Sequence, residues 1–278
     1  MGWKIVFYIF YGLLSGLAEI MPVSATAQGY VLTELTALQT RHPLMLMMMH
    51  CAILAVIIFQ YRHRLGHMRR ELQLEFQDSR RRKRQPDRNT VLDAKIVMFV
   101  SLPVIVMQLF SGMVYQRWAG LVLISIALTI SGIAIYVPQF KPGANRDSRH
   151  LSPAEGLRLG FWSGLSIIPG ISRMGMLLSC GLQRGCAKRY ILDIAFLSAI
   201  PVLLVMILSD LIQLLVMGFA AIDGTLVLFS SLAAIAACFG AWLGMVVMRF
   251  LSLNASYSAF SYYCWGLAMF SFILYLMV

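Results

Sequence analysis

Six long runs of apolar residues divide the chain, and each is close to the length needed to cross a bilayer as a helix. A hydrocarbon core of roughly 30 Å takes about 20 helical residues or slightly fewer. No alternating strand pattern accompanies the runs, and backbone polarity in lipid therefore favours helices. We predict six transmembrane helices, at residues 43–60, 96–111, 118–138, 190–208, 224–247 and 257–276.

Two further apolar regions, 3–37 and 154–184, are interrupted in the middle by Pro, Gly and polar residues. The first contains Gly12-Leu-Leu-Ser-Gly-Leu17 and the second contains Gly160-Phe-Trp-Ser-Gly-Leu165, at an offset of 148 residues. In both, Pro and then Ser follow. Interrupted segments at matching places in two halves are typical of inverted-repeat membrane proteins. We predict two re-entrant helical hairpins within a single integral membrane domain, 1–278, whose repeat halves are 1–138 and 152–278.

The positive charges are divided unevenly between the two sides of this topology. If each hairpin returns to the side it entered, 19 of the 23 Lys and Arg residues share one side. Eleven of these lie in the segment 61–95, which we predict to be a cytoplasmic basic loop beside anionic lipid head groups. The loop 209–223 carries Asp210 and Asp223 but no cation, and we predict that it lies outside. The other predicted cytoplasmic cations are Lys141, Arg146, Arg149, Arg158, Arg184, Lys188, Arg189 and Arg249, and the outer ones are Lys4, Arg41 and Arg117.

Composition agrees with a membrane protein and excludes several other classes. Hydrophobic residues make up 59% of the chain and charged residues 13%, unlike a soluble enzyme, a disordered chain or a disulfide-rich secreted domain. The net charge of +11 comes without any nucleic-acid-binding motif, so we expect no nucleic acid partner. Only one Lys precedes the first apolar run, so we expect no cleaved signal peptide.

Few ionisable residues lie at membrane depth, where burying a charge is costly. Only Glu19 and Arg173 lie at corresponding breaks of the two repeats, so we predict that the hairpin tips bring them together. Their pairing is either a lock between the hairpins or a substrate site. His50 is interpreted as a satisfied polar contact, and Asp193 as a partner of Arg184 or Arg189 or as a support for the second hairpin.

The second break has the composition of an anion site. The sequence Pro169-Gly-Ile-Ser-Arg173 places a guanidinium at the start of a half-helix, where free backbone N–H groups and the helix dipole attract anions. The planar fork of Arg matches phosphate oxygens, and Ser24 and Thr26 add hydroxyls from the other hairpin. These groups predict a phosphate monoester or diphosphate whose tail lies in lipid.

The two broken segments resemble the signature motifs of the undecaprenyl-diphosphate phosphatases, the bacitracin-resistance membrane family. Those motifs read G-L-T-E-F-L-P-V-S-S-x-G-H and P-G-x-S-R-S-G. This chain has Gly16-Leu-Ala-Glu-Ile-Met-Pro-Val-Ser24 and Pro169-Gly-Ile-Ser-Arg-Met-Gly175. The resemblance implies removal of the terminal phosphate of undecaprenyl diphosphate in the bacterial inner membrane. That reaction recycles the lipid carrier of cell-envelope synthesis.

The residues and the resemblance together give a set of expected roles. We expect catalysis by Glu19, Arg173, Ser24 and Thr26, and a divalent cation, Mg²⁺ or Ca²⁺, held by Glu19. The expected substrate-binding residues are Gly170, Ser172, Arg173 and Gln28. A small-residue pair, Gly240 and Gly244, predicts a close helix contact, either within one chain or between two copies in a homodimer.

Four positions depart from the family pattern: Ser15 replaces a Glu, Ala25 a Ser, Gln28 a His and Leu177 a Thr. The chain retains more of the family's anion-binding residues than of its proton-transfer residues. We therefore expect slower hydrolysis than in family members that have all of these residues. The alternative is a non-hydrolysing transporter or flippase for polyprenyl phosphate or another anionic lipid, which would fit the same inverted repeat.

Overall fold

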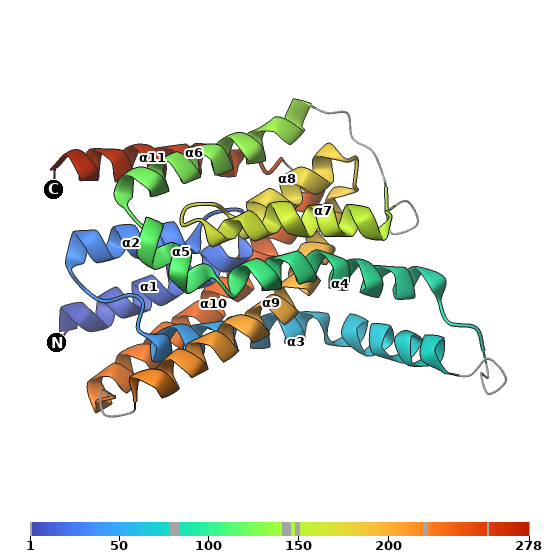
Figure 1. The fold of residues 1–278 in the computed structure, drawn as a ribbon, viewed down its shortest axis with the longest axis horizontal. Helices are drawn as coiled ribbons and strands as arrows, with labels where there is room; N and C mark the ends of the chain where they lie inside the picture. The colour runs from blue at the N-terminus through green and yellow to red at the C-terminus, as the bar shows by residue number, and fades with distance from the viewer. Residues whose placement is uncertain are drawn as a thin grey trace.

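The computed structural model describes residues 2–77, 84–140, 146–147, 151–218, 222–254 and 256–277. Within these residues the chain forms eleven α-helices, two short 3₁₀ helices and no β-strand beyond one isolated bridge (Figure 1). Seven helices in this part of the chain are long and apolar enough to cross a membrane. The prediction of an all-α polytopic membrane protein is confirmed.

Each interrupted region forms a pair of helices joined at a break. In the first region, α1 (Gly2–Ile20) is followed by α2 (Ala25–Thr36); in the second, α7 (Pro153–Gly164) is followed by the 3₁₀ helix η3 (Leu165–Ile167) and α8 (Arg173–Gln183). The α1–α2 pair extends inward from the end of the molecule that holds both termini, and the α7–α8 pair from the opposite end (Figure 1). The prolines predicted to interrupt these regions lie in the breaks, where a missing N–H does not disturb a helix.

The remaining elements pack across the two halves. Helices α1 and α10 form the most extensive pair, and α7 packs correspondingly on α4. Helices α6 and α11 form another pair, and α3 packs on both α9 and α10. Each hairpin therefore packs on a long helix of the other half. The elements are α3 (Pro43–Phe76), α4 (Arg88–Gln108), α5 (Ser111–Trp118), α6 (Leu121–Tyr136), η1 (Val137–Phe140), α9 (Lys188–Met217), α10 (Gly224–Asn254) and α11 (Ala259–Met277).

The repeated glycines allow these cross-half contacts. A Cβ on Gly16 would lie 2.2 Å from the carbonyl oxygen of Ala237 in α10. A Cβ on Gly160, in the second copy of the repeated Gly-x-x-Ser-Gly-Leu segment, would lie 2.2 Å from the carbonyl oxygen of Val100 in α4. Both positions need Gly because the neighbouring backbone fills the space. A Cβ on Gly240 would likewise lie 2.3 Å from the carbonyl oxygen of Leu13 in α1. The predicted small-residue contact is therefore made within one chain.

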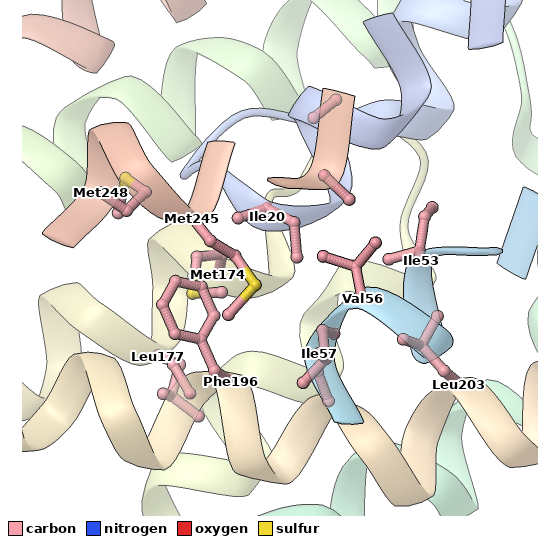
Figure 2. Packing of buried hydrophobic residues seen from close by; sticks show 14 of the residues in the cluster. Ile20, Ile53, Val56, Ile57, Met174, Leu177, Phe196, Leu203, Met245 and Met248 are labelled. Carbon is pink, nitrogen blue, oxygen red and sulfur yellow. The ribbon is translucent and has the colours of Figure 1, made fainter. Parts of the chain in front are cut away.

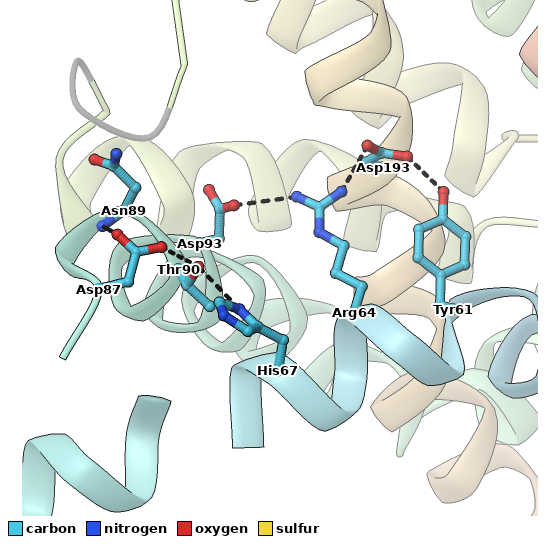
Figure 3. A network of polar contacts seen from close by, with 8 residues as sticks. All are labelled: Tyr61, Arg64, His67, Asp87, Asn89, Thr90, Asp93 and Asp193. Carbon is cyan, nitrogen blue, oxygen red and sulfur yellow. Dashed lines mark hydrogen bonds and ion pairs between the residues drawn. The ribbon is translucent and has the colours of Figure 1, made fainter. Parts of the chain in front are cut away.

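The segment 61–95 is not the loop that the sequence predicted. Helix α3 continues to Phe76 and α4 begins at Arg88, so only the residues between them connect the two helices. Arg64 explains part of the extension, because its guanidinium bonds Asp193 at 2.6 Å and Asp93 at 3.1 Å (Figure 3). Asp193 also accepts from Tyr61. The predicted pairing of Asp193 with Arg184 or Arg189 is therefore wrong, since the α3 extension lies beside the start of α9.

The described cations predicted to share one side do gather at one end of the molecule. Backbone bonds join Arg146 to Gly185 and Ala187, and Arg249 donates to Gln60 near the Arg64 pairs. At the opposite end, Arg41 stacks on the ring of Tyr115. Lys141, Arg149 and the cations at 80–83 lie outside the described residues.

An apolar core surrounds the place where the hairpin tips meet. Ile20 at the end of α1 and Met174 at the start of α8 are buried beside Phe196 of α9 and Met245 of α10 (Figure 2). Leu177 is buried in the same cluster. Because Ile20 and Met174 directly adjoin Glu19 and Arg173, this packing holds the two charged side chains in place.

Candidate functional site

The two hairpin tips meet through one ion pair. A terminal nitrogen of Arg173 lies 2.6 Å from Oε1 of Glu19, and the two side chains are 14% and 13% exposed. Glu19 is in the last turn of α1 and Arg173 is the first residue of α8. A cation at a helix N-terminus is opposed by the helix dipole. Glu19 offsets that repulsion, and an additional anion at the same place would be attracted.

The loop before α8 is shaped by buried polar contacts. Ser172 caps α8 by accepting from the backbone N–H of Gly175 at 3.0 Å. Its own N–H donates to the hydroxyl of Ser131, which donates to the carbonyl of Gly170. Gly170 has φ +106°, and a Cβ there would lie 2.7 Å from Cβ of Ala127. Gly170 and Ser172 therefore set the position of Arg173, and Ser131 is a supporting residue that no sequence pattern had marked.

The first hairpin supplies hydroxyls next to the ion pair. Ser24 caps α2 through the N–H of Ala27 and bonds the hydroxyl of Thr26 at 3.0 Å. Gln28 is directed elsewhere, because its amide donates to the Tyr263 hydroxyl of α11 at 2.8 Å. The structure therefore brings together Glu19, Ser24, Thr26 and Arg173, but not Gln28.

A cavity of about 190 Å³ lies at the hairpin tips. Its wall includes the side chains of Glu19, Ser24, Thr26 and Arg173 and continues to Arg41 and Tyr115 at the end opposite the cation cluster. Among the residues named from the breaks, Gly170, Ser172 and Gln28 are not part of the wall. Of the departures from the family pattern, Ser15 and Ala25 line the cavity, whereas Gln28 and Leu177 do not.

Two further polar residues of the cavity wall were not assigned to the site from the sequence. His50 of α3 bonds Asp210 of α9, with Nδ1 2.7 Å from Oδ2. The polar contact predicted for His50 is thus present, but the sequence predicts Asp210 in an outer loop, 209–223. That placement is wrong because α9 continues to Met217 and Asp210 is only 6% exposed. The apolar residues that follow Asp210 were the available signal for a longer helix.

The donor atoms of this cavity fit a cation that arrives with a phosphorylated substrate. Mg²⁺ is commonly held by one or two carboxylates together with substrate phosphates. Glu19 supplies a carboxylate and Ser24 and Thr26 supply hydroxyl oxygens within the same wall. In the described part of the chain no three His, Cys, Asp or Glu side chains form a metal-binding group, so the protein offers only part of a coordination shell.

Comparison with known proteins agrees with this arrangement. The model of the bacitracin resistance protein BacA family matches residues 8–270. Undecaprenyl-diphosphatase 1 of Shouchella clausii is 26% identical over 276 residues, covering 95% of this chain and 94% of the relative. Undecaprenyl-diphosphatases of Methanobrevibacter smithii and Thermosipho melanesiensis are 25% and 24% identical, covering 92% and 96% of this chain and 92% and 98% of the relatives. The chain therefore belongs to the BacA family.

Proposed function

We propose that this protein removes the terminal phosphate of undecaprenyl diphosphate, leaving undecaprenyl phosphate for cell-envelope synthesis. The observation that carries the proposal is the guanidinium of Arg173, held at the start of α8 by Glu19 in a polar cavity. The relatives compared above are named for this activity. The substrate has a charged head and an apolar tail, which suits a polar cavity inside a membrane protein.

The side chains of the cavity divide the work between binding and chemistry. Arg173 binds phosphate oxygens through its fork, and Ser24 and Thr26 donate hydrogen bonds to the same group. Glu19 orients the guanidinium. A divalent cation, when bound at Glu19, would supply positive charge to the phosphate oxygens. Positioning and charge neutralisation are the main sources of rate in phosphoryl transfer.

The reaction consumes one water. An oxygen of the water bonds to the terminal phosphorus, and the bond from that phosphorus to the bridging oxygen breaks. The bridging oxygen leaves with its electron pair on undecaprenyl phosphate, and one proton of the water must be accepted by a base. Glu19 is one group of this cavity that can accept a proton, and Thr26 is the alternative nucleophile if a covalent phosphoenzyme forms.

The charge distribution supports an orientation. Positively charged ends of membrane proteins lie in the cytoplasm, so the cation-rich end with Arg64, Arg146 and Arg249 is assigned inside. The cavity then continues toward the outer side, where Arg41 lies. We extend the proposal to the bacterial inner membrane and to contact of the basic end with anionic lipid head groups.

The direct test is phosphate release by the purified protein. Undecaprenyl diphosphate should yield inorganic phosphate, and undecaprenyl monophosphate should yield none. Activity should fall with EDTA and return with Mg²⁺ or Ca²⁺. Tight binding of both lipids without any phosphate release would instead support the transporter alternative and contradict the proposal.

A further inference from the structure

A histidine and a buried aspartate are hydrogen-bonded to each other in the wall of the same cavity. His50 lies on α3 and Asp210 on α9, and the imidazole Nδ1 is 2.7 Å from the carboxylate Oδ2. The two side chains are 12% and 9% exposed. Both belong to the cavity wall that includes Glu19 and Arg173. Among the described residues, His50 contributes the one imidazole of this wall.

The hydrogen bond fixes how the imidazole is presented. A carboxylate only accepts hydrogen bonds, so Nδ1 donates its proton to Asp210, and the lone pair of a neutral ring is then on Nε2. Nε2 has no hydrogen-bond partner among the described residues. A carboxylate that orients an imidazole also stabilises the imidazolium that forms when the ring takes a proton. The pair is thus arranged to accept a proton inside the cavity.

A purely structural pair explains the observations less well. Burying a carboxylate is costly, and a buried ion pair is commonly no more stabilising than well-packed apolar residues. The neighbours of His50 and Asp210 on the cavity wall include Met49, Ile53 and Met206, so apolar packing was available at this place. A carboxylate that orients an imidazole inside a cleft is instead the arrangement that proton-transferring sites use.

We propose that His50 is the general base of the hydrolysis and that Asp210 is its positioning residue. This inference rests on the proposed phosphatase function. In the step, Nε2 takes a proton from the attacking water as its oxygen bonds to the terminal phosphorus. The bond to the bridging oxygen breaks, the electron pair leaves with undecaprenyl phosphate, and the imidazolium returns its proton to the leaving phosphate. Glu19 is then free to hold Arg173 and a cation.

The charges around His50 are those of the cavity and of its helix neighbours. Asp210 is its direct partner, and Arg173 is already paired with Glu19. The other titratable groups of the wall are Tyr11 of α1, Arg41 before α3 and Tyr115 of α5, and Cys51 adjoins His50 on α3. Asp210 is the one acidic residue in hydrogen-bond contact with the imidazole.

The test compares four variants with the parent protein, with undecaprenyl diphosphate as the substrate. His50→Gln keeps a polar side chain of similar size but cannot exchange a proton, and we expect kcat to fall by roughly 10²–10⁴-fold, the usual contribution of a general base. KM should stay within about threefold, since His50 is not assigned to phosphate binding. Asp210→Asn should lower kcat by up to roughly 10⁴-fold, because an amide at this place favours the wrong tautomer of the imidazole. The matched control is His63→Gln on the exposed surface of the same helix, which should keep the parental rate.

Two readouts separate proton transfer from a structural role. The pH profile of kcat/KM for the parent should fall on the acid side, where an imidazole becomes protonated, and this fall should be absent from His50→Gln. Added imidazole should partly restore the activity of His50→Ala. Parental kcat and an unchanged pH profile in His50→Gln would overturn the proposal. Activity lost only in proportion to unfolded protein, without rescue by imidazole, would overturn it as well.

The same experiment distinguishes this inference from the function on which it rests. If the parent releases no phosphate, the proposed phosphatase function fails, and the base assignment fails with it. If the parent and His50→Gln release phosphate equally, the function stands and only the assignment of His50 fails.

Discussion

Replacing Arg173 with Lys tests whether the ion pair is a ligand site or a lock between the hairpins. Lysine keeps the positive charge and can still pair with Glu19, which lies 2.6 Å from the guanidinium. It loses the planar fork that binds two phosphate oxygens at once. A lock needs only the charge and the reach, whereas a phosphate site needs the fork.

The expected loss follows from the contact that disappears. A hydrogen bond to a charged group contributes about 1.5–3 kcal/mol, and the Arg173 side chain that would make it is only 14% exposed. That energy corresponds to roughly ten- to a hundredfold in affinity. The pair with Glu19 remains, so the free energy of unfolding should change little.

Binding and stability must be measured on the same protein samples. Titration of undecaprenyl phosphate and diphosphate should show the affinity loss in Arg173→Lys, and thermal unfolding should not shift appreciably. Arg117→Lys, at an exposed position outside the cavity, is the matched control and should change neither. Glu19→Gln should spare phosphate binding and reduce the cation-dependent step.

One combination of results would refute this reasoning. If Arg173→Lys binds both lipids as tightly as the parent, while Arg173→Lys and Glu19→Gln both unfold at lower temperature, the pair is structural. The ligand site would then have to lie elsewhere in the cavity.

Three other predictions test the fold, the orientation and the departures from the family pattern. In a protein whose five cysteines are replaced, Val216→Cys should react with an impermeant maleimide in intact cells and Gln85→Cys only after permeabilisation; the reverse would invert the topology. Gly16→Ala should destabilise the protein by about 1–3 kcal/mol, because its Cβ would lie 2.2 Å from the backbone of Ala237. The control, Gly66→Ala, has open space around the new Cβ and should not destabilise the protein. Equal unfolding temperatures of the two variants would contradict the packing. Ala25→Ser places a hydroxyl on the cavity wall and should raise the rate of phosphate release. Gln28→His alone should change this rate less, because the side chain at position 28 bonds Tyr263. A larger gain from Gln28→His would contradict the geometry.

The helices and the hairpin tips were predictable from the sequence because each depends on a local pattern. Apolar length sets the membrane-crossing runs, and Pro and Gly set the breaks. The repeated Gly-x-x-Ser-Gly-Leu segments align the two halves of the chain. This alignment is enough to expect that Glu19 and Arg173 meet. The structure adds that glycines of these segments, Gly16 and Gly160, serve close packing against the opposite half.

The residues that were missed depend on contacts between distant segments. Asp210 ended an apolar run and was assigned to a loop, since nothing local shows that His50 lies 2.7 Å away. The extension of α3 is polar, and its ion pair with Asp193 joins residues 129 positions apart. The direction of Gln28 is decided by Tyr263 of α11. Periodicity and motif spacing carry no information on such pairs.

The role of the cavity in catalysis is tested by phosphate release from undecaprenyl diphosphate by the parent and by Arg173→Ala, with folding of both checked by thermal unfolding. Loss of one preorganised charge-stabilising donor lowers the rate by roughly 10²–10³-fold. We predict release by the parent and at least a hundredfold slower release by the folded variant. Equal rates in the two proteins would contradict the assignment of the catalytic site to the cavity at the hairpin tips.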